Sequence, residues 1–256
     1  MRRIVMIASV LVGIVVNAEP EKSSLGAKGV ANISGEEEYA NPYITEGLIA
    51  MWDGEWNIGL GKHDYNSTTW KDLSGRGLNL TDSKFRWIDN ALDDSASNIR
   101  IDLEELHITG GLTLEAVVMC PNPRNNAFIF DFYNHVDVGC TMYTTALASP
   151  YGLMCHLRNG SYSANTDRMK CDDNNRCSCS FIWDDSKWGV FFFGESVGFG
   201  NIPFIQPQVY YILGASNVTW QNFRGYVHCL RIYSRALTTD EVSYNYSIDR
   251  ERFNLP

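Results

Sequence analysis

The stretch Tyr226-Val-His-Cys-Leu-Arg-Ile-Tyr-Ser-Arg-Ala-Leu-Thr-Thr-Asp-Glu241 decides the fold, and it begins with a strand pattern. Leu230 and Ile232 are two residues apart, so they share one face of an extended strand. Arg231 and Tyr233 share the other face, where we expect their long side chains to reach solvent or to pair across strands. The pattern predicts a strand over 226–233 with one face toward a core.

A helix start follows this strand directly. Thr238 and Glu241, three residues apart, form a capping box, in which each side chain satisfies an amide at the helix N-terminus. We expect a short helix from here through about Tyr246, covering an open end of the protein.

Upstream of residue 226, short apolar runs alternate with turn clusters such as Ser74-Gly-Arg-Gly77, and no fixed repeat is visible. This texture is typical of a β-sandwich and not of βαβ units. The predicted fold class is all-β, a two-sheet antiparallel jelly-roll sandwich over 45–256 with one short C-terminal helix. The other expected strands cover 48–52, 99–103, 112–120, 127–132, 152–158, 180–183, 188–193 and 210–214.

The N-terminus has the order of a secretory signal. Arg2 and Arg3 precede an uncharged apolar run, and Val16-Asn-Ala18 supplies small residues for cleavage. We therefore predict a signal peptide over 1–18, a flexible polar lead-in over 19–44, and a secreted, periplasmic or cell-surface location. The apolar run is shorter than the roughly 20 residues of a membrane-spanning helix. No membrane span is expected after signal cleavage.

The charge balance limits the partners. The whole chain has a net charge of −9, and loss of Arg2 and Arg3 with the signal peptide makes it −11. Nucleic acid is not an expected partner, because phosphate recognition needs clustered lysine and arginine. A neutral glycan, a cell-surface protein or a metal cation remains compatible with this charge.

Several segments together resemble the laminin-G-like (LamG) domains of the concanavalin A-like lectin/glucanase superfamily. The resemblance covers about residues 46–253 and implies the same lectin-type sandwich. It rests on Gly47-Leu-Ile-Ala-Met-Trp-Asp53, Trp70-Lys-Asp-Leu-Ser-Gly-Arg-Gly77, Leu112-Thr-Leu-Glu-Ala-Val117, Trp188-Gly-Val-Phe-Phe-Phe-Gly-Glu195 and the closing stretch Phe223–Val242. In the fourth segment Phe-Gly stands where the family pattern has Asn-Gly.

Catalytic motifs are absent from the sequence. Glucanases of this superfamily carry Glu-x-Asp-x-x-Glu on one strand, which supplies the paired carboxylates of sugar hydrolysis. The nearest approach here is Asp102-Leu-Glu104, on a face expected to be solvated. No Gly-x-Ser-x-Gly motif accompanies the five histidines. We therefore predict that the protein is not an enzyme.

Aromatic and polar residues in loop-like segments are the candidates for ligand binding. Sugar recognition needs ring faces beside groups that bond hydroxyls. The candidates are Trp56, His63, Asp64, Tyr65 and Trp220. Core packing is the alternative for any of the rings.

Acidic and cysteine clusters supply two further hypotheses. Calcium is a possible cofactor, with Asp89, Asp93, Asp172 and Asp173 as candidate ligands on Asx-rich loops, although ordinary turns explain the same pattern. Cys171, Cys177 and Cys179 are disulfide candidates, because Cys171-Asp-Asp-Asn-Asn-Arg-Cys-Ser-Cys179 has the composition of a surface loop. Their spacing is a poor match to a zinc site.

The predicted function is a secreted, non-catalytic glycan-binding or adhesion module. The alternatives are a structural or protein-binding cell-envelope component and, third, a glycoside hydrolase. Fold alone does not decide among them.

Overall fold

The computed structural model describes residues 30–31, 37–38, 40–94, 101–103, 106, 108, 110–121, 127–133, 138–145, 152–159, 162–165, 169–170, 176–214 and 222–256. The predicted signal peptide, Cys171, Asp172, Asp173 and Trp220 lie outside these residues. Tyr43, assigned from the sequence to the lead-in, is buried against the C-terminal helix.

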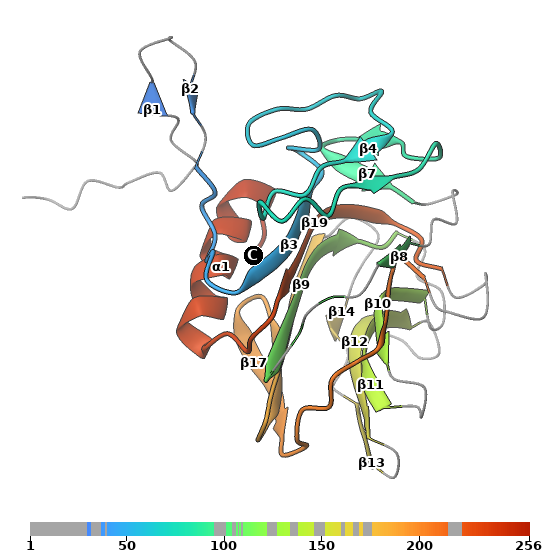
Figure 1. The fold of residues 1–256 in the computed structure, drawn as a ribbon, viewed down its shortest axis with the longest axis vertical. Coiled ribbons are helices and arrows are strands. Elements are labelled where there is room, and N and C mark those ends of the chain that lie inside the picture. Colours follow the sequence, from blue (N-terminus) through green and yellow to red (C-terminus); the bar gives the residue numbers. More distant parts are fainter. Residues whose placement is uncertain are drawn as a thin grey trace, which may run out of the picture.

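The protein is an all-β sandwich of two antiparallel sheets, as predicted (Figure 1). One sheet contains β8 (Ile101–Leu103), β10 (Ala127–Tyr133), β11 (Val138–Thr145), β12 (Gly152–Asn159), β13 (Tyr162–Asn165), β14 (Met169–Lys170) and β18 (Val209–Ile212). The other contains β3 (Leu48–Asp53), β6 (Trp87–Ile88), β7 (Ala91–Asp93), β9 (Gly111–Met119), β15 (Arg176–Asp184), β16 (Trp188–Phe192), β17 (Glu195–Gly200) and β19 (Tyr226–Tyr233).

Two small two-stranded sheets accompany the sandwich. They pair β1 (Val30–Ala31) with β2 (Glu37–Glu38), and β4 (Thr69–Trp70) with β5 (Leu80–Thr81). The segment between β3 and β4, residues 54–68, forms a long loop at one end of the sandwich (Figure 1).

The main core lies between the two large sheets. Strand β9 is central in the eight-stranded sheet, with β15 on one side and β19 on the other. Its inward residues Leu114 and Ala116 join a cluster that includes Phe130 and Leu157 of the opposite sheet. Alternation along β9 therefore sends every second side chain into the sandwich.

The outer face of the eight-stranded sheet is also buried, because helix α1 (Thr239–Phe253) packs on it (Figure 1). This corrects two expectations. The helix runs to Phe253 instead of about Tyr246, and it covers a sheet face instead of an open end. Arg231 and Tyr233, expected to reach solvent or to pair across strands, are 2% and 0% exposed beneath it, and Arg231 pairs with Glu115 on the neighbouring strand β9.

The helix start agrees with the sequence signal. Thr238 Oγ1 accepts from the Glu241 amide at 3.2 Å, and Glu241 Oε2 accepts from the Thr238 amide at 2.8 Å, which completes the capping box. Asn254 ends the helix in the left-handed conformation. In the part of the chain that the structure describes, no helix has the length and apolarity needed to cross a membrane.

Candidate functional site

The loop 54–68 is anchored at its base by the C-terminal helix. Arg252, in the last turn of α1, donates to Asp53 Oδ2 at 2.7 Å and to Glu55 Oε2 at 2.7 Å. Its guanidinium also lies 3.7 Å from the centre of the Trp56 ring. Since Trp56 is only 7% exposed, it packs beneath the helix and is not the surface platform that its loop position suggested.

A buried amide fixes the middle of the loop. Asn57 is fully buried; its Nδ2 donates to the Asp64 carbonyl at 2.8 Å, and its Oδ1 accepts from the Asp64 amide at 2.9 Å. The paired bonds hold Asp64 as a backbone partner would. Sequence analysis missed Asn57, because nothing in its local pattern separates a buried loop amide from an exposed one.

Three of the predicted ligand-binding residues meet on this loop, and we call His63, Asp64 and Tyr65 the Tyr65 surface. The Tyr65 ring is 60% exposed and packs against the edge of the His63 ring, with the ring centres 4.3 Å apart. Asp64 is exposed beside them, and its Oδ1 accepts from the Asn66 amide at 2.8 Å. An exposed ring next to a carboxylate has the composition of a sugar-contacting surface.

The histidine of this surface has one unpaired nitrogen. His63 Nδ1 lies 2.9 Å from the Gly54 carbonyl oxygen, which can only accept, so Nδ1 carries the hydrogen. Within the part of the chain that the structure describes, Nε2 is buried and has no hydrogen-bond partner. Buried polar atoms normally have partners, so this acceptor next to Tyr65 is a candidate contact for a donor group.

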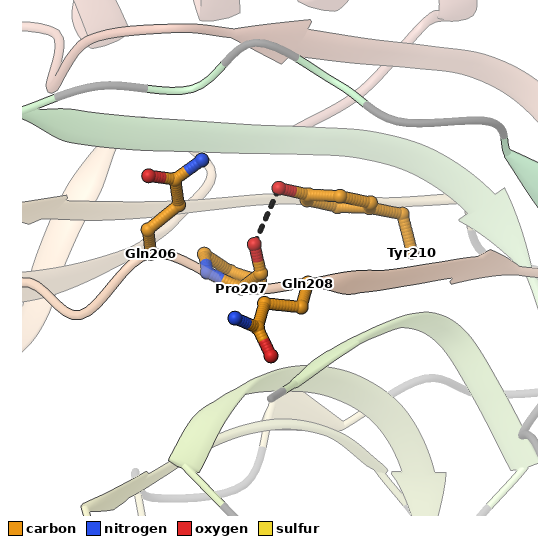
Figure 2. Close-up of a pocket in the computed structure, with 4 residues that line it drawn as sticks. All are labelled: Gln206, Pro207, Gln208 and Tyr210. Atoms are coloured by element: carbon orange, nitrogen blue, oxygen red, sulfur yellow. Dashed lines mark hydrogen bonds between the residues drawn. The ribbon is translucent and has the colours of Figure 1, made fainter. Parts of the chain in front are cut away.

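A polar pocket of about 320 Å³ lies along the connection that leads from β17 in the eight-stranded sheet to β18 in the seven-stranded sheet. Gln206, Pro207, Gln208 and Tyr210 line it, with the Gln206 amide and the Gln208 amide on opposite sides of the chain (Figure 2). The Tyr210 hydroxyl contacts the Pro207 carbonyl oxygen at 2.5 Å, and the tyrosine is 2% exposed. The pocket thus offers amides but no exposed ring.

A buried ionic cluster between the sheet and α1 is a structural element. Arg231 donates to Glu115 Oε2 at 2.7 Å and to both carboxylate oxygens of Asp249, and Asn245 Nδ2 donates to Glu115 Oε2 at 2.9 Å. Burial raises the pKa of Glu115, which Arg231 partly offsets. These carboxylates are bound to an arginine under a helix, so they are not placed for acid–base work on a ligand.

The candidate calcium ligands do not converge among the described residues. Asp89 and Asn90 have φ of 49° and 59° and form the two-residue turn between β6 and β7. Asp93 is ion-paired with Arg86, whose Nε donates to it at 2.8 Å. Over the described ranges, no three His, Cys, Asp or Glu side chains gather as a metal site requires. Calcium binding stays a prediction, since Asp172 and Asp173 lie outside those ranges.

Part of the segment that suggested a local disulfide is a strand. Cys177 and Cys179 carry buried thiols within β15, which starts at Arg176 and not at about residue 180. The surface-loop setting expected for these two cysteines is therefore wrong, while the pairing of Cys171 with one of them stays a prediction. Cys171 lies outside the described residues.

No family model and no curated protein sequence matches the chain, but solved structures share its fold. A sialidase from Trypanosoma rangeli matches 88% of the chain with a TM-score of 0.60 and 15% identity, over 37% of its own length. Domain 4 of AbnA, a GH43 extracellular arabinanase from Geobacillus stearothermophilus solved with arabinotriose, matches 77% of the chain and 96% of its own length (TM-score 0.56, 17% identity). The binding domain of Paraclostridial Mosquitocidal Protein 1 matches 79% of the chain (TM-score 0.57, 13% identity), over 52% of its own length.

These matches correct the predicted function. The predicted secreted, non-catalytic glycan-binding or adhesion module, with a glycoside hydrolase ranked third, is contradicted, because two of the similar structures come from glycoside hydrolases, the sialidase and the arabinanase. The identities are low, and the chain spans little more than a third of the sialidase. The comparisons therefore show the fold alone.

Proposed function

We propose that this chain is a glycan-recognition domain that serves glycan degradation, of the kind that glycoside hydrolases carry. The observation that carries the proposal is the Tyr65 surface: a ring 60% exposed, beside Asp64 and the unpaired Nε2 of His63. The AbnA domain, which was solved with a bound trisaccharide, supports the same assignment for this fold.

The preferred ligand is a neutral oligosaccharide. A chain of net charge −9 attracts anionic glycans poorly. Hydroxyl groups of a neutral sugar can donate to the exposed carboxylate of Asp64.

The proposal also includes a more specific family, an exported location and a cofactor. The four ordered motifs and the closing stretch support a LamG-like member of the concanavalin A-like superfamily. The charge, apolar run and Val16-x-Ala18 site at the N-terminus support export, and residues 89 to 93 and 172 to 173 keep calcium as a candidate cofactor. Amino-terminal sequencing of exported protein tests the cleavage site.

Replacing Tyr65 by alanine is expected to weaken binding of arabinotriose about tenfold or more. Loss of the exposed ring removes the surface that covers the sugar's C–H face, and roughly 1.4 kcal/mol corresponds to a factor of ten. Stability should change by less than about 0.5 kcal/mol, since the ring is solvent-exposed. Isothermal titration calorimetry with arabinotriose measures the affinity, and thermal unfolding measures the stability.

Tyr244→Ala is the matched control, because Tyr244 is 42% exposed on α1, on a different element from the loop. This variant should bind arabinotriose like the wild type. Equal affinity of Tyr65→Ala and the wild type would overturn the assignment of the site, as would equal losses in both tyrosine variants.

A further inference from the structure

Five buried cysteines lie in the core between the two large sheets. They are Cys120, Cys140, Cys155, Cys177 and Cys179, each 1% exposed or less. Within this group, Cys155 belongs to β12 in the seven-stranded sheet and Cys179 belongs to β15 in the eight-stranded sheet. Their sulfur atoms are 3.6 Å apart.

This contact joins strands that have no backbone hydrogen bonds with each other. Cys155 is opposite Met142 of β11, and Cys179 is opposite Ala116 and Phe192 of its own sheet. The two thiols therefore meet across the sandwich core. A disulfide has its sulfurs about 2.0 Å apart, so the pair must close by only about 1.6 Å. Small side-chain rotations from opposite sheets can supply that distance.

We propose that Cys155 and Cys179 form a disulfide that links the two sheets when the chain folds in an oxidising compartment. The site is independent of the Tyr65 surface, which lies on the loop between β3 and β4. The bond would link two cysteines that are 24 positions apart in the sequence, on strands β12 and β15.

The electrons pass to an external disulfide such as glutathione disulfide. One cysteine thiolate attacks that disulfide, forms a mixed disulfide and releases one glutathione thiolate. The second cysteine thiolate then attacks the mixed disulfide and releases the second glutathione. One S–S bond breaks and one forms, two protons leave the cysteines, and two glutathione thiols are produced.

The exchange must take place before the sandwich closes or while it is open. Both sulfurs are buried, and attack requires an accessible thiolate. Burial and the neighbouring Cys155 raise the pKa of Cys140 well above its usual value, so Cys140 reacts poorly in the folded state. Cys140 is the natural competitor of Cys179 for pairing with Cys155, because it lies on β11 diagonally across from Cys155.

The test is to refold the wild-type protein from denaturant with a glutathione redox buffer or with reductant alone. Peptide mapping by mass spectrometry without reduction should find a peptide joining Cys155 to Cys179. The oxidised protein should melt roughly 5–10 °C above the reduced one, as expected for closing a loop of this length. Linkage of Cys155 to Cys140, or both Cys155 and Cys179 as thiols after oxidative refolding, would overturn the proposal.

Two alanine variants provide the controls. Cys140→Ala should keep the Cys155–Cys179 peptide and the difference in melting temperature, and Cys155→Ala should lose both. If Cys155→Ala fails to fold, the peptide map of the wild type still decides. Arabinotriose binding should be the same in oxidised and reduced wild type, so this inference and the proposed function fail separately.

Discussion

Replacing Arg231 by methionine is expected to destabilise the protein by about 3–5 kcal/mol, the cost typical of removing one partner from a buried ion pair. The side chain is 2% exposed, and its guanidinium binds Glu115 and Asp249 between the sheet and α1. Without it, two carboxylates stay buried close together with no cation between them. Urea unfolding at pH 7 measures the loss.

Arg235→Met is the matched control, because Arg235 is also paired with a carboxylate, Glu241, but its side chain is 27% exposed. Solvent screens this pair, so its loss should cost about 1 kcal/mol or less. If both variants lost the same stability, the description of α1 as sealing a buried ionic cluster would be wrong.

Acidification from pH 6.5 to about 4 is expected to destabilise the protein through His228. Burial, and second the Arg176 guanidinium, lower the pKa of His228 from 6.5 to about 4. Arg176 Nε donates to His228 Nε2 at 3.0 Å, which requires an unprotonated acceptor. The unfolded chain takes up this proton first, so stability is complete above pH 6.5 and falls toward pH 4, by up to about 3 kcal/mol.

Urea unfolding at several values between pH 7 and 4 measures this loss. The raised pKa of Glu115 acts in the opposite direction near the acid end of the range, so the comparison must be made against a variant. In His228→Gln, an amide oxygen can accept from Arg176 without titrating. This variant should lose less stability than the wild type over the same range; parallel curves would contradict the role of His228.

The sequence predicted several strands well because alternation is a local property, although β11 and β17 were not among them. The strand over 226–233 was predicted with the bounds that β19 has, and the strand 127–132 differs from β10 by one residue. The start of β15 was missed, because Arg176-Cys-Ser-Cys179 follows Cys171-Asp-Asp-Asn-Asn175 and has the polar composition of a loop. The small side chains of Cys177, Ser178 and Cys179 are nevertheless buried within this strand.

The environment of Arg231 and Tyr233 could not be predicted from the strand pattern. Alternation correctly placed them opposite Leu230 and Ile232, but whether that face is solvated depends on where α1 docks. The helix docks through contacts between residues far apart in sequence, such as Tyr43 with Asp249. Such contacts leave no periodic signal.

The candidate site was predicted only in part, again because contacts between residues far apart in sequence shape it. His63, Asp64 and Tyr65 are consecutive, so their proximity follows from the sequence. The burial of Trp56 depends on Arg252, almost 200 residues away, and the shape of the loop depends on the buried Asn57. Both effects come from tertiary contacts.

The most direct test of the account is a titration of the ¹⁵N-labelled protein with arabinotriose, followed by amide chemical shifts. We expect saturable shifts that cluster on residues 54–68, centred on Tyr65, with little change at Gln206, Gln208 and Tyr210. Absence of saturable shifts with arabinotriose and with a panel of other neutral oligosaccharides would contradict glycan recognition. Shifts confined to the pocket at Gln206–Tyr210 would contradict the Tyr65 surface as the site.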